Sequence, residues 1–450
     1  MVDPKASHFW RATIRSGLID VGGLEACLAA IDPEGCSPGK LDRRLARQAV
    51  VSGKLTGWQA QQLLRGRWKG LIIGKYVLLG VLGRGGMGQV YLARDTRLDR
   101  HVAMKVLASE RGHCPRRRAR FRRESKIAGG LQDEHLIRVY DDGEAFGLHF
   151  LVMEYIDGQS IAQLIHRCGM LPPAAAAEAT RQVALGLEYL DRKGLIHRDV
   201  TPSNILVDRG GTTKLTDFGL AVHLDEPDIL TVEGSTLGTF DYLSPEQARA
   251  PHDIDIRSDI YSLGCSLYHM IAGAVPYPGT TTAGKVLAHR ELEADPLAML
   301  SPSCPPGLAV VVRRMMRKRP DERYARPSEV AAALEPFASG PGPLSRIVAM
   351  GTGHREGSGA AIDGAYTAEW FDSDSELDDA GGGAATGPPA SGSEQDVFPR
   401  VDSEPGLPPQ AGPPPDVPAS GPVWWRGPWP VAAAALALLA SVLAIALAIR

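Results

Sequence analysis

Apolar residues recur at helical spacing through the first 70 residues of the chain, between short turns rich in glycine and proline. Asp20 and Thr56, both residue types that favour a helix amino terminus, each precede an apolar-patterned stretch. The sequence SGLID at residues 16–20 is echoed 36 positions later by SGKLT at residues 52–56. This weak repeat predicts two helix–turn–helix units in one small helical module over residues 1–70, for which a role in interaction or positioning is a hypothesis.

The pattern changes at about residue 76. Apolar runs at residues 76–82, 90–93 and 101–107 have the length and composition of β-strands, and helical periodicity prevails further along the chain. The motifs that carry chemistry fall almost entirely between this point and residue 337. We therefore predict an α+β domain over residues 76–337.

Two compositional changes follow this domain. Residues 339–422 are rich in glycine, proline, serine and acidic residues, so they cannot bury enough apolar surface to offset the entropy of ordering, and we predict a disordered linker. Residues 431–449 carry no charge, and a helix of this length spans roughly 28 Å, close to the thickness of the hydrocarbon core. Trp424, Trp425 and Trp429 stand where an aromatic belt would lie. This segment predicts a C-terminal transmembrane helix, with a buried alanine-rich helix as the alternative.

Composition narrows the function classes only a little. The apolar and charged fractions, 44% and 22%, are those of an ordinary globular protein, and the net charge of −3 gives no support for a nucleic-acid partner. The six cysteines include no C-x-x-C pair, which favours reduced thiols over a disulfide framework or a zinc site. The first ten residues contain no apolar run, so we expect no secretory signal.

A glycine-rich segment, GRGGMG at residues 83–88, joins the first two predicted strands. Glycines at this spacing let a hairpin fold tightly over a polyphosphate and offer it backbone N–H groups. The pattern alone is weak, because dinucleotide-binding turns share it. A dinucleotide-binding turn would lead into a helix, however, whereas this segment leads into another strand.

Lys105 lies within the apolar strand at residues 101–107. A buried ammonium group is costly without an anionic partner. ATP phosphates are one candidate partner, and Glu124, in the helical stretch 116–131, is another. An edge-strand lysine with its charged end in water is the structural alternative.

Three further groups suit phosphoryl transfer: Asp199 and Asn204 within HRDVTPSN, and Asp217 at the start of DFG. This reaction needs a carboxylate near the attacking hydroxyl and oxygen ligands for Mg²⁺. Each of these residues alone could serve as a cap or a turn residue. Their order, behind a glycine loop and a strand lysine, favours the catalytic interpretation.

Together these motifs resemble those of the eukaryotic-like (Hanks-type) serine/threonine protein kinases of bacteria. The resemblance covers residues 76–337, and the GGMG form of the loop and the SPEQ sequence at residues 244–247 are typical of the bacterial members. It implies a bilobal protein-kinase fold, with an antiparallel β-sheet N-lobe, a mainly α-helical C-lobe and ATP between them. It also implies an ATP- and Mg²⁺-dependent enzyme that phosphorylates serine and threonine hydroxyls of proteins, including its own activation loop.

The resemblance assigns roles by position. Lys105 would pair with Glu124 and contact the phosphates, Asp199 would be the catalytic base, and Asn204 and Asp217 would hold Mg²⁺. The nucleotide would also be contacted by residues of the glycine loop, the strands beside it and the hinge, which is residues 154–156. These residues are Leu82, Gly83, Arg84, Gly85, Gly86, Met87, Gly88, Val90, Ala103, Met153 as gatekeeper, Glu154 and Ile156.

Arg198, directly before Asp199, implies an activation loop that phosphorylation switches on, because a phosphate would give the arginine a charge-assisted partner. The candidate acceptors are Thr236 and Ser235, and then Thr231. By the same resemblance, Glu246 and Arg323 form a structural ion pair, and Asp259 supports the catalytic loop.

One departure from the family pattern concerns Thr201, which stands where serine/threonine kinases usually have a lysine that helps to neutralise the γ-phosphate. A nucleotide-binding pseudokinase scaffold is therefore the alternative function, and a small-molecule phosphotransferase is another. The four intact catalytic groups speak against the scaffold. The long segment from Asp217 to Glu246 speaks against the small-molecule enzyme.

The expected partners are ATP, protein substrates and a membrane, which the tail helix would cross once with the kinase domain on the cytoplasmic side. A homodimer through the N-lobe is implied by the resemblance.

Overall fold

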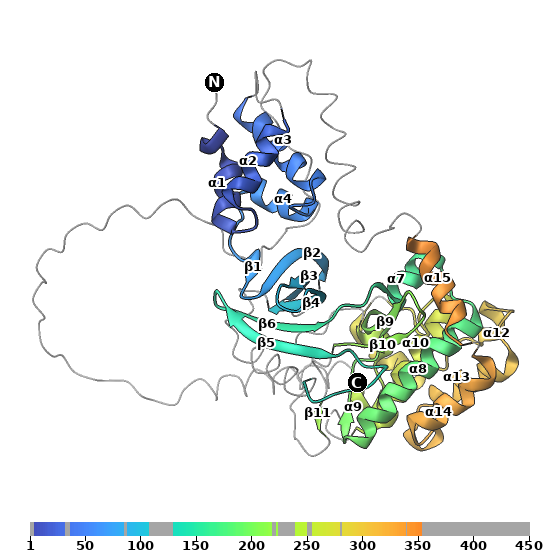
Figure 1. Ribbon diagram of the computed structural model, residues 1–450. Helices are drawn as coiled ribbons and strands as arrows, with labels where there is room; N and C mark the ends of the chain where they lie inside the picture. Colours follow the sequence, from blue (N-terminus) through green and yellow to red (C-terminus); the bar gives the residue numbers. More distant parts are fainter. Residues whose placement is uncertain are drawn as a thin grey trace, which may run out of the picture. The chain divides into compact units, whose positions relative to one another are not determined.

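The computed structural model describes residues 4–31, 37–84, 88–107, 129–217, 222–223, 239–249, 254–279, 281–338 and 340–352. Its first part is helical (Figure 1). The elements are a short 3-10 turn η1 (Pro4–Ala6) and the helices α1 (His8–Ser16), α2 (Val21–Ala29), α3 (Pro38–Val51) and α4 (Gly57–Leu64).

Capping residues define where these four helices begin. Ser7, Asp20, Ser37 and Thr56 each accept a hydrogen bond from a backbone N–H of the first turn through a side-chain oxygen, which satisfies a donor that has no partner within the helix. The helices after Asp20 and Thr56 thus begin where the sequence predicts. We refer to residues 4–73 as the helical module.

A six-stranded antiparallel sheet follows, and with it begins the N-lobe. Its strands are β1 (Ile72–Ile73), β2 (Tyr76–Arg84), β3 (Gly88–Asp95), β4 (Arg100–Leu107), β5 (Val139–Ala145) and β6 (Leu148–Glu154), in the order β1-β2-β3-β4-β6-β5. The strand runs predicted at residues 76–82, 90–93 and 101–107 are therefore β2, β3 and β4. β2 and β3 form the hairpin that carries the glycine-rich segment at its tip.

The C-lobe is mainly helical. Its helices are α7 (Ile161–Cys168), α8 (Pro173–Arg192), α9 (Pro245–Arg249), α10 (Ile256–Ala272), α11 (Thr282–Glu291), α12 (Leu297–Leu300), α13 (Pro306–Met315), α14 (Pro327–Leu334) and α15 (Gly342–Thr352), with 3-10 turns η2 (Pro202–Asn204), η4 (Thr239–Tyr242), η5 (Pro320–Glu322) and η6 (Glu335–Phe337). Short strands pair as β10 (Thr213–Leu215), β9 (Ile205–Asp208) and β7 (Gly158–Ser160), and as β11 (Val222–His223) with β8 (Leu195–Ile196). A sheet-built lobe followed by a helical lobe confirms the predicted α+β, two-lobed architecture.

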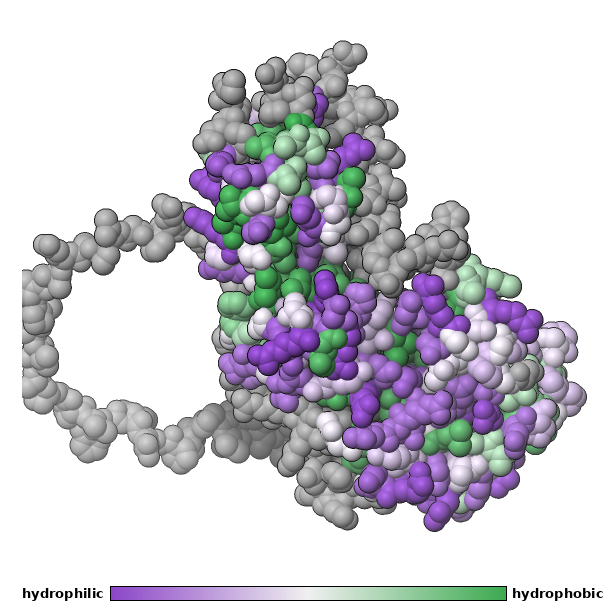
Figure 2. All heavy atoms as spheres, viewed as in Figure 1, coloured by the Kyte–Doolittle hydropathy of each residue, from purple (hydrophilic) through white to green (hydrophobic). Residues whose placement is uncertain are grey.

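Two large apolar clusters stabilise this part of the chain. One lies in the C-lobe around α8 and α10 and extends to Ala103 and Met153 of the N-lobe sheet. The other is shared between the helical module and the sheet, where Phe9, Leu45 and Trp58 pack in one cluster with Tyr91 and Phe150. Apolar side chains are visible in green where the module adjoins the sheet (Figure 2).

Helix α15 corrects the predicted start of the linker. Residues 342–352 lie inside the stretch read as disordered from residue 339, yet Leu344 and Val348 are fully buried against the C-lobe core. The i, i+4 spacing of these two residues gives the segment an apolar stripe. The glycine and proline around it made the average composition of the stretch resemble that of a linker.

No helix within the described ranges is both long and apolar enough to cross a membrane. The predicted transmembrane segment, residues 431–449, and most of the predicted linker lie outside the described residues.

Candidate active site

The hairpin of β2 and β3 carries the first part of the site. Gly88 can only be glycine, because a Cβ atom there would lie 2.0 Å from the carbonyl oxygen of Val106 on the neighbouring strand. Gly83 pairs with Val90 across the hairpin. Gly85, Gly86, Met87 and the side chain of Arg84 lie outside the described residues.

Below this hairpin, predicted nucleotide-contacting residues line up along one apolar surface. Ala103 and Met153 are buried in the C-lobe cluster, and Val90 and Ile156 pack against its edge. Leu82, by contrast, is 37% exposed near the hairpin tip. Strands β3, β4 and β6 and the hinge thus bring together side chains that are 66 positions apart in the sequence.

Lys105 lies in the middle of β4, where it pairs with Val90 on one side and Leu151 on the other. Its side chain is 7% exposed, and its Nζ atom lies 2.7 Å from Oδ1 of Asp217. The buried ammonium group therefore has an anionic partner, which offsets the free energy needed to remove its charge from water. Glu124, the other predicted partner, lies outside the described residues.

The predicted catalytic base and metal ligands converge from two segments. Asn204 donates from Nδ2 to the carbonyl oxygen of Asp199 at 2.9 Å and to its Oδ2 atom at 3.0 Å. The N–H of Thr216 donates to the carbonyl oxygen of Asn204 at 2.9 Å, which sets Asp217 beside them. Lys105 thus contacts Asp217, and Thr216, the residue before Asp217, connects this segment to Asn204 and through it to Asp199.

The backbone is strained at Asp217 and at Arg198, the residue directly before Asp199. Arg198 and Asp217 both have φ of +68°, a left-handed value that costs energy in residues other than glycine. Such strain persists only where surrounding contacts impose it. The backbone of Arg198 and of its neighbour His197 has such contacts, with Asp259. Asp259 accepts hydrogen bonds from the N–H groups of His197 at 2.7 Å and of Arg198 at 2.8 Å.

Burial shifts the pKa values of the two residues that support this loop, Asp259 and His197. Asp259 is fully buried, and burial raises its pKa to about 7, although the backbone donors of His197 and Arg198 act in the opposite direction. Burial lowers the pKa of His197 to about 4, so its ring is neutral at pH 7. Its Nε2 lies 3.1 Å from the carbonyl oxygen of Thr216, while its Nδ1 accepts from the N–H of Asp199. The neutral ring with its proton on Nε2 satisfies both contacts.

The end of the predicted activation segment is tied to this loop by a residue that sequence reasoning did not single out. Gln247 donates from Nε2 to the carbonyl oxygen of Arg198 at 3.0 Å. Its Oε1 also accepts from the N–H of Ser244. The signal in the sequence was the spacing of Ser244 and Gln247, which is that of a capping box at the start of α9.

Arg323 and Glu246 form the predicted ion pair. Two parallel contacts of 2.6 and 2.9 Å join their side chains, and Arg323 is not exposed at all. Burial alone would raise the pKa of Glu246, but the hydrogen bonds and charge of Arg323 outweigh it and lower that pKa.

The hinge holds a second ion pair that the sequence did not predict. The carboxylate of Glu154 lies 3.2 Å from Nζ of Lys214, a residue on β10 in the C-lobe. The N–H of Glu154 also donates to the carbonyl oxygen of Arg138. These contacts orient the backbone of the segment from Met153 to Ile156, where adenine recognition is predicted.

The donor set suits a divalent cation. Within the described residues no cluster of three or more histidine, cysteine or acidic side chains has metal-binding geometry. Asn204 and Asp217 nevertheless supply amide and carboxylate oxygens, the hard donors that Mg²⁺ prefers. Asp217 is 42% exposed, and Asn204 uses its Nδ2 toward Asp199, which leaves its oxygen for another contact. The two residues therefore fit such an ion.

The predicted phosphorylation sites, Thr231, Ser235 and Thr236, lie outside the described residues.

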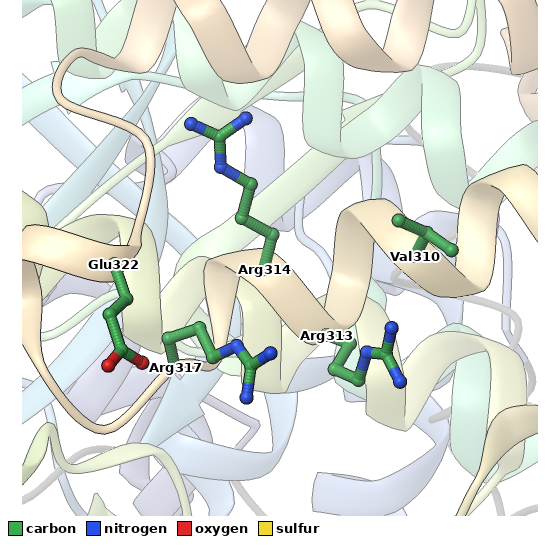
Figure 3. Close-up of a pocket in the computed structure, with 5 residues that line it drawn as sticks. All are labelled: Val310, Arg313, Arg314, Arg317 and Glu322. Atoms are coloured by element: carbon green, nitrogen blue, oxygen red, sulfur yellow. The ribbon is translucent and has the colours of Figure 1, made fainter.

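A separate hollow lies on the C-lobe, away from these motifs in the sequence. It has a volume of about 430 Å³ and is lined by Val310, Arg313, Arg314, Arg317 and Glu322 (Figure 3). Arg314 points away from the other two arginines in this view, and its guanidinium stacks 4.2 Å from the ring of Tyr324. None of the residues that line this hollow belongs to the predicted catalytic set.

Comparison with known proteins identifies a family whose sequence pattern this chain matches. Residues 76–334 match the family described as protein kinase domain. The chain is 37% identical over 295 residues to a Streptomyces coelicolor protein named as a probable serine/threonine-protein kinase, which covers 64% of this chain and 44% of that protein. It is 37% identical over 273 residues to the serine/threonine-protein kinase PknB of Mycobacterium leprae, with coverage of 60% and 44%. The match thus spans less than half the length of these relatives.

A solved structure is also similar. The kinase domain of Mycobacterium tuberculosis PknI is 29% identical, and the match covers 60% of this chain and 98% of that one with a TM-score of 0.48.

Proposed function

Because the chain belongs to the protein kinase family, we propose that it transfers the γ-phosphoryl group of ATP to serine and threonine hydroxyls of proteins, including its own activation loop. The observation that carries this proposal is the convergence of four groups: Lys105 contacts Asp217, Thr216 beside Asp217 donates to Asn204, and Asn204 donates to Asp199. The curated relatives that bear this activity in their names support it.

Nucleotide binding would use the apolar surface below the hairpin and the hinge backbone. The adenine would lie on the apolar surface of Val90, Ala103 and Met153 and would hydrogen-bond to the hinge backbone at Glu154 and Ile156. Lys105 would then place its ammonium group at the phosphates, and the glycine hairpin would cover them with backbone N–H donors.

Phosphoryl transfer is mainly a matter of position and charge. Asp199 would accept the hydrogen bond of the substrate hydroxyl and take up its proton as the oxygen attacks. Its carboxylate is held in place by Asn204. Mg²⁺, when bound between Asn204 and Asp217, would neutralise charge on the phosphates. The neutral His197 and the buried Asp259 would keep this loop rigid.

Thr201 bears on the alternative function. It is 7% exposed and precedes η2, and its short side chain cannot take the place of the family lysine at the γ-phosphate. The pseudokinase reading rests on this residue alone, whereas the four catalytic groups are all present in this sequence.

The proposal is tested by phosphate incorporation with the full chain, purified in detergent, and with Mg²⁺ and radiolabelled ATP. Replacement of Asp199 by asparagine removes the base, so we expect the rate to fall by about 100-fold or more. Mass spectrometry should locate phosphate on Thr236 or Ser235 in the wild type only. Nucleotide binding without any phosphate transfer, to itself or to a general protein substrate, would favour the scaffold instead.

We further propose that residues 431–449 form a single membrane-spanning helix and that the catalytic domain faces the cytoplasm, where ATP is available. The uncharged apolar composition of this segment supports the proposal. Contact between two copies through their N-lobes is a further expectation from the family resemblance.

A further inference from the structure

The amino terminus of α4 makes an unusual contact with strand β2. Within the helix, Thr56 and Gln59 form a capping box: the N–H of Gln59 donates to Oγ1 of Thr56 at 3.2 Å, and the N–H of Thr56 donates to Oε1 of Gln59 at 2.8 Å. Both side chains then use their remaining donor outside the helix. Thr56 Oγ1 donates to the carbonyl oxygen of Leu79 at 2.6 Å, and Gln59 Nε2 donates to that of Leu78 at 2.7 Å.

Both carbonyl groups lie at an interruption in the pairing of β2 with β3. The register between β2 and β3 shifts between Leu78 and Gly80, so Leu79 has no partner residue in that ladder. On the other edge, β1 pairs as far as Val77, and the N–H of Leu78 then donates to the carbonyl oxygen of Leu71 at 2.9 Å. Leu78 is fully buried, and a buried carbonyl group without a hydrogen bond is destabilising. The capping box therefore completes the hydrogen bonding of the bulge.

Packing extends the same contact to the second strand of the hairpin. Trp58, between the two capping residues, is 6% exposed, and its ring centroid lies 5.8 Å from that of Tyr91 on β3. Tyr91 follows Val90, one of the residues expected against the nucleotide. Helix α4 thus contacts both strands that lead to the glycine-rich tip.

A hollow adjoins the two hydrogen bonds. It has a volume of about 470 Å³, and Thr56, Gln59, Leu79 and Arg94 are among the residues that line it. On this side the bulge therefore borders open space, where the two hydrogen bonds hold it.

The bulge lies four positions before Gly83, and a second register shift follows between Val81 and Gly83. A bulge bends its strand and increases the local twist, so its conformation sets the direction in which β2 continues to Gly83. We propose that Thr56 and Gln59 are positioning residues for ATP binding: they hold the β2 bulge and thereby orient the glycine hairpin over the phosphates. This inference rests on the proposed kinase function and gives the helical module a part in it.

The variants can separate the two tasks of each side chain. Thr56→Asp keeps a cap acceptor for the N–H of Gln59 but has no hydroxyl donor for Leu79. Gln59→Glu keeps the acceptor for Thr56 and loses the donor for Leu78. Thr56→Ser retains both functions and serves as the conservative rescue. Asp20→Ala is the matched control, because Asp20 caps α2 of the same module and makes no hydrogen bond to β2 among the described contacts.

We would measure the KM for ATP and the kcat of the full chain on a general protein substrate, and the affinity for a fluorescent ATP analogue in an Asp199→Asn background. Each of Thr56→Asp and Gln59→Glu should weaken nucleotide binding and raise the KM by about three- to tenfold, the range of one net hydrogen bond. The kcat should stay within about twofold, since the catalytic loop is untouched. Thr56→Ser should behave as the wild type, and Asp20→Ala should lower the melting temperature alone.

Two results would overturn the inference. One is an unchanged nucleotide affinity in both variants with melting temperatures reduced as in Asp20→Ala, which would make the contact purely structural. The other is an equal loss of affinity in Asp20→Ala, which would make the effect a general one of module stability. The binding assay needs no phosphate transfer, so an inactive wild type whose nucleotide affinity still depends on Thr56 and Gln59 would refute the proposed function and leave the positioning role standing.

Discussion

His197 lies at the centre of the candidate site, yet no reacting group is expected to touch it. Its ring bridges the backbone of Thr216, next to Asp217, and that of Asp199. It is a buried neutral spacer between the two segments that carry the predicted base and metal ligands. A proton on Nδ1 would remove the acceptor that the N–H of Asp199 uses.

This burial predicts a pH dependence of stability. The folded pKa of His197 is about 4, below the value of about 6.5 in an unfolded chain. Its contribution is therefore complete above pH 6.5 and is lost as the pH falls toward 4, because only the unfolded state binds the proton in that window. We expect the free energy of unfolding to fall by roughly 3 kcal/mol over this interval on account of His197.

Urea unfolding of the wild type and of His197→Asn at several pH values between 4 and 7 checks this expectation. The wild type should lose stability more steeply than the variant on acidification. The buried carboxyl of Asp259, whose raised pKa acts in the opposite direction, is common to both proteins and largely cancels in the difference. Parallel pH profiles would show that the ring is solvated or charged in the folded state.

At the scale of single elements, the contact between α9 and the turn before α14 is a buried ion pair. Glu246→Gln would leave the guanidinium of Arg323 buried without its charge partner, and we expect a loss of about 3–5 kcal/mol in the free energy of unfolding. In the double variant Glu246→Gln with Arg323→Met, both charges are gone and part of the loss should be recovered. Denaturant titration of the single and double variants gives this cycle, and additive losses would contradict a coupled pair.

Helix α4 offers a second prediction at this scale. Trp58 is buried in the apolar cluster that the helical module shares with the sheet. Trp58→Ala should destabilise the protein by about 3–5 kcal/mol through lost burial and a cavity. Because one cluster serves both parts, calorimetry should show the module and the N-lobe unfolding together at a lower temperature. A separate early transition for residues 4–73 would mean that they fold independently.

These elements differ in how far the sequence could predict them. Lys105, Asp199, Asn204 and Asp217 could be predicted from the sequence because each lies in a short motif whose order along the chain is distinctive. The contact of α4 with β2 could not be found in this way. It depends on a bulge, and a bulge is a property of the pairing between two strands rather than of either strand alone.

Composition was a weaker guide than pattern. The glycine and proline around residues 339–343 suggested a linker, although Leu344 and Val348 already mark a helix face. The interaction of Glu154 with Lys214 was also missed, because the two residues are 60 positions apart and belong to different lobes. Contacts of this range follow from the tertiary fold, which short motifs do not encode.

At the scale of the whole chain, the proposed membrane anchor leads to a direct test. Full-length protein should sediment with lipid vesicles, and a chain that stops after residue 430 should remain in the supernatant, because it lacks the apolar segment 431–449. The truncated protein should retain its phosphorylation activity, which serves as the control for folding. Equal partition of the two proteins would contradict the anchor.

The cluster shared by the helical module and the sheet has a practical consequence for anyone who wishes to produce the enzyme in pieces. The family match begins at residue 76, but Tyr91 packs against Trp58, and Tyr76 and Phe150 are buried in the same apolar cluster as side chains that come before it. A fragment cut at the family boundary would present these aromatic residues to water as one adhesive surface. Such a fragment would aggregate or dimerise through this newly exposed surface. Its oligomeric state would then reflect the truncation and not the full-length protein.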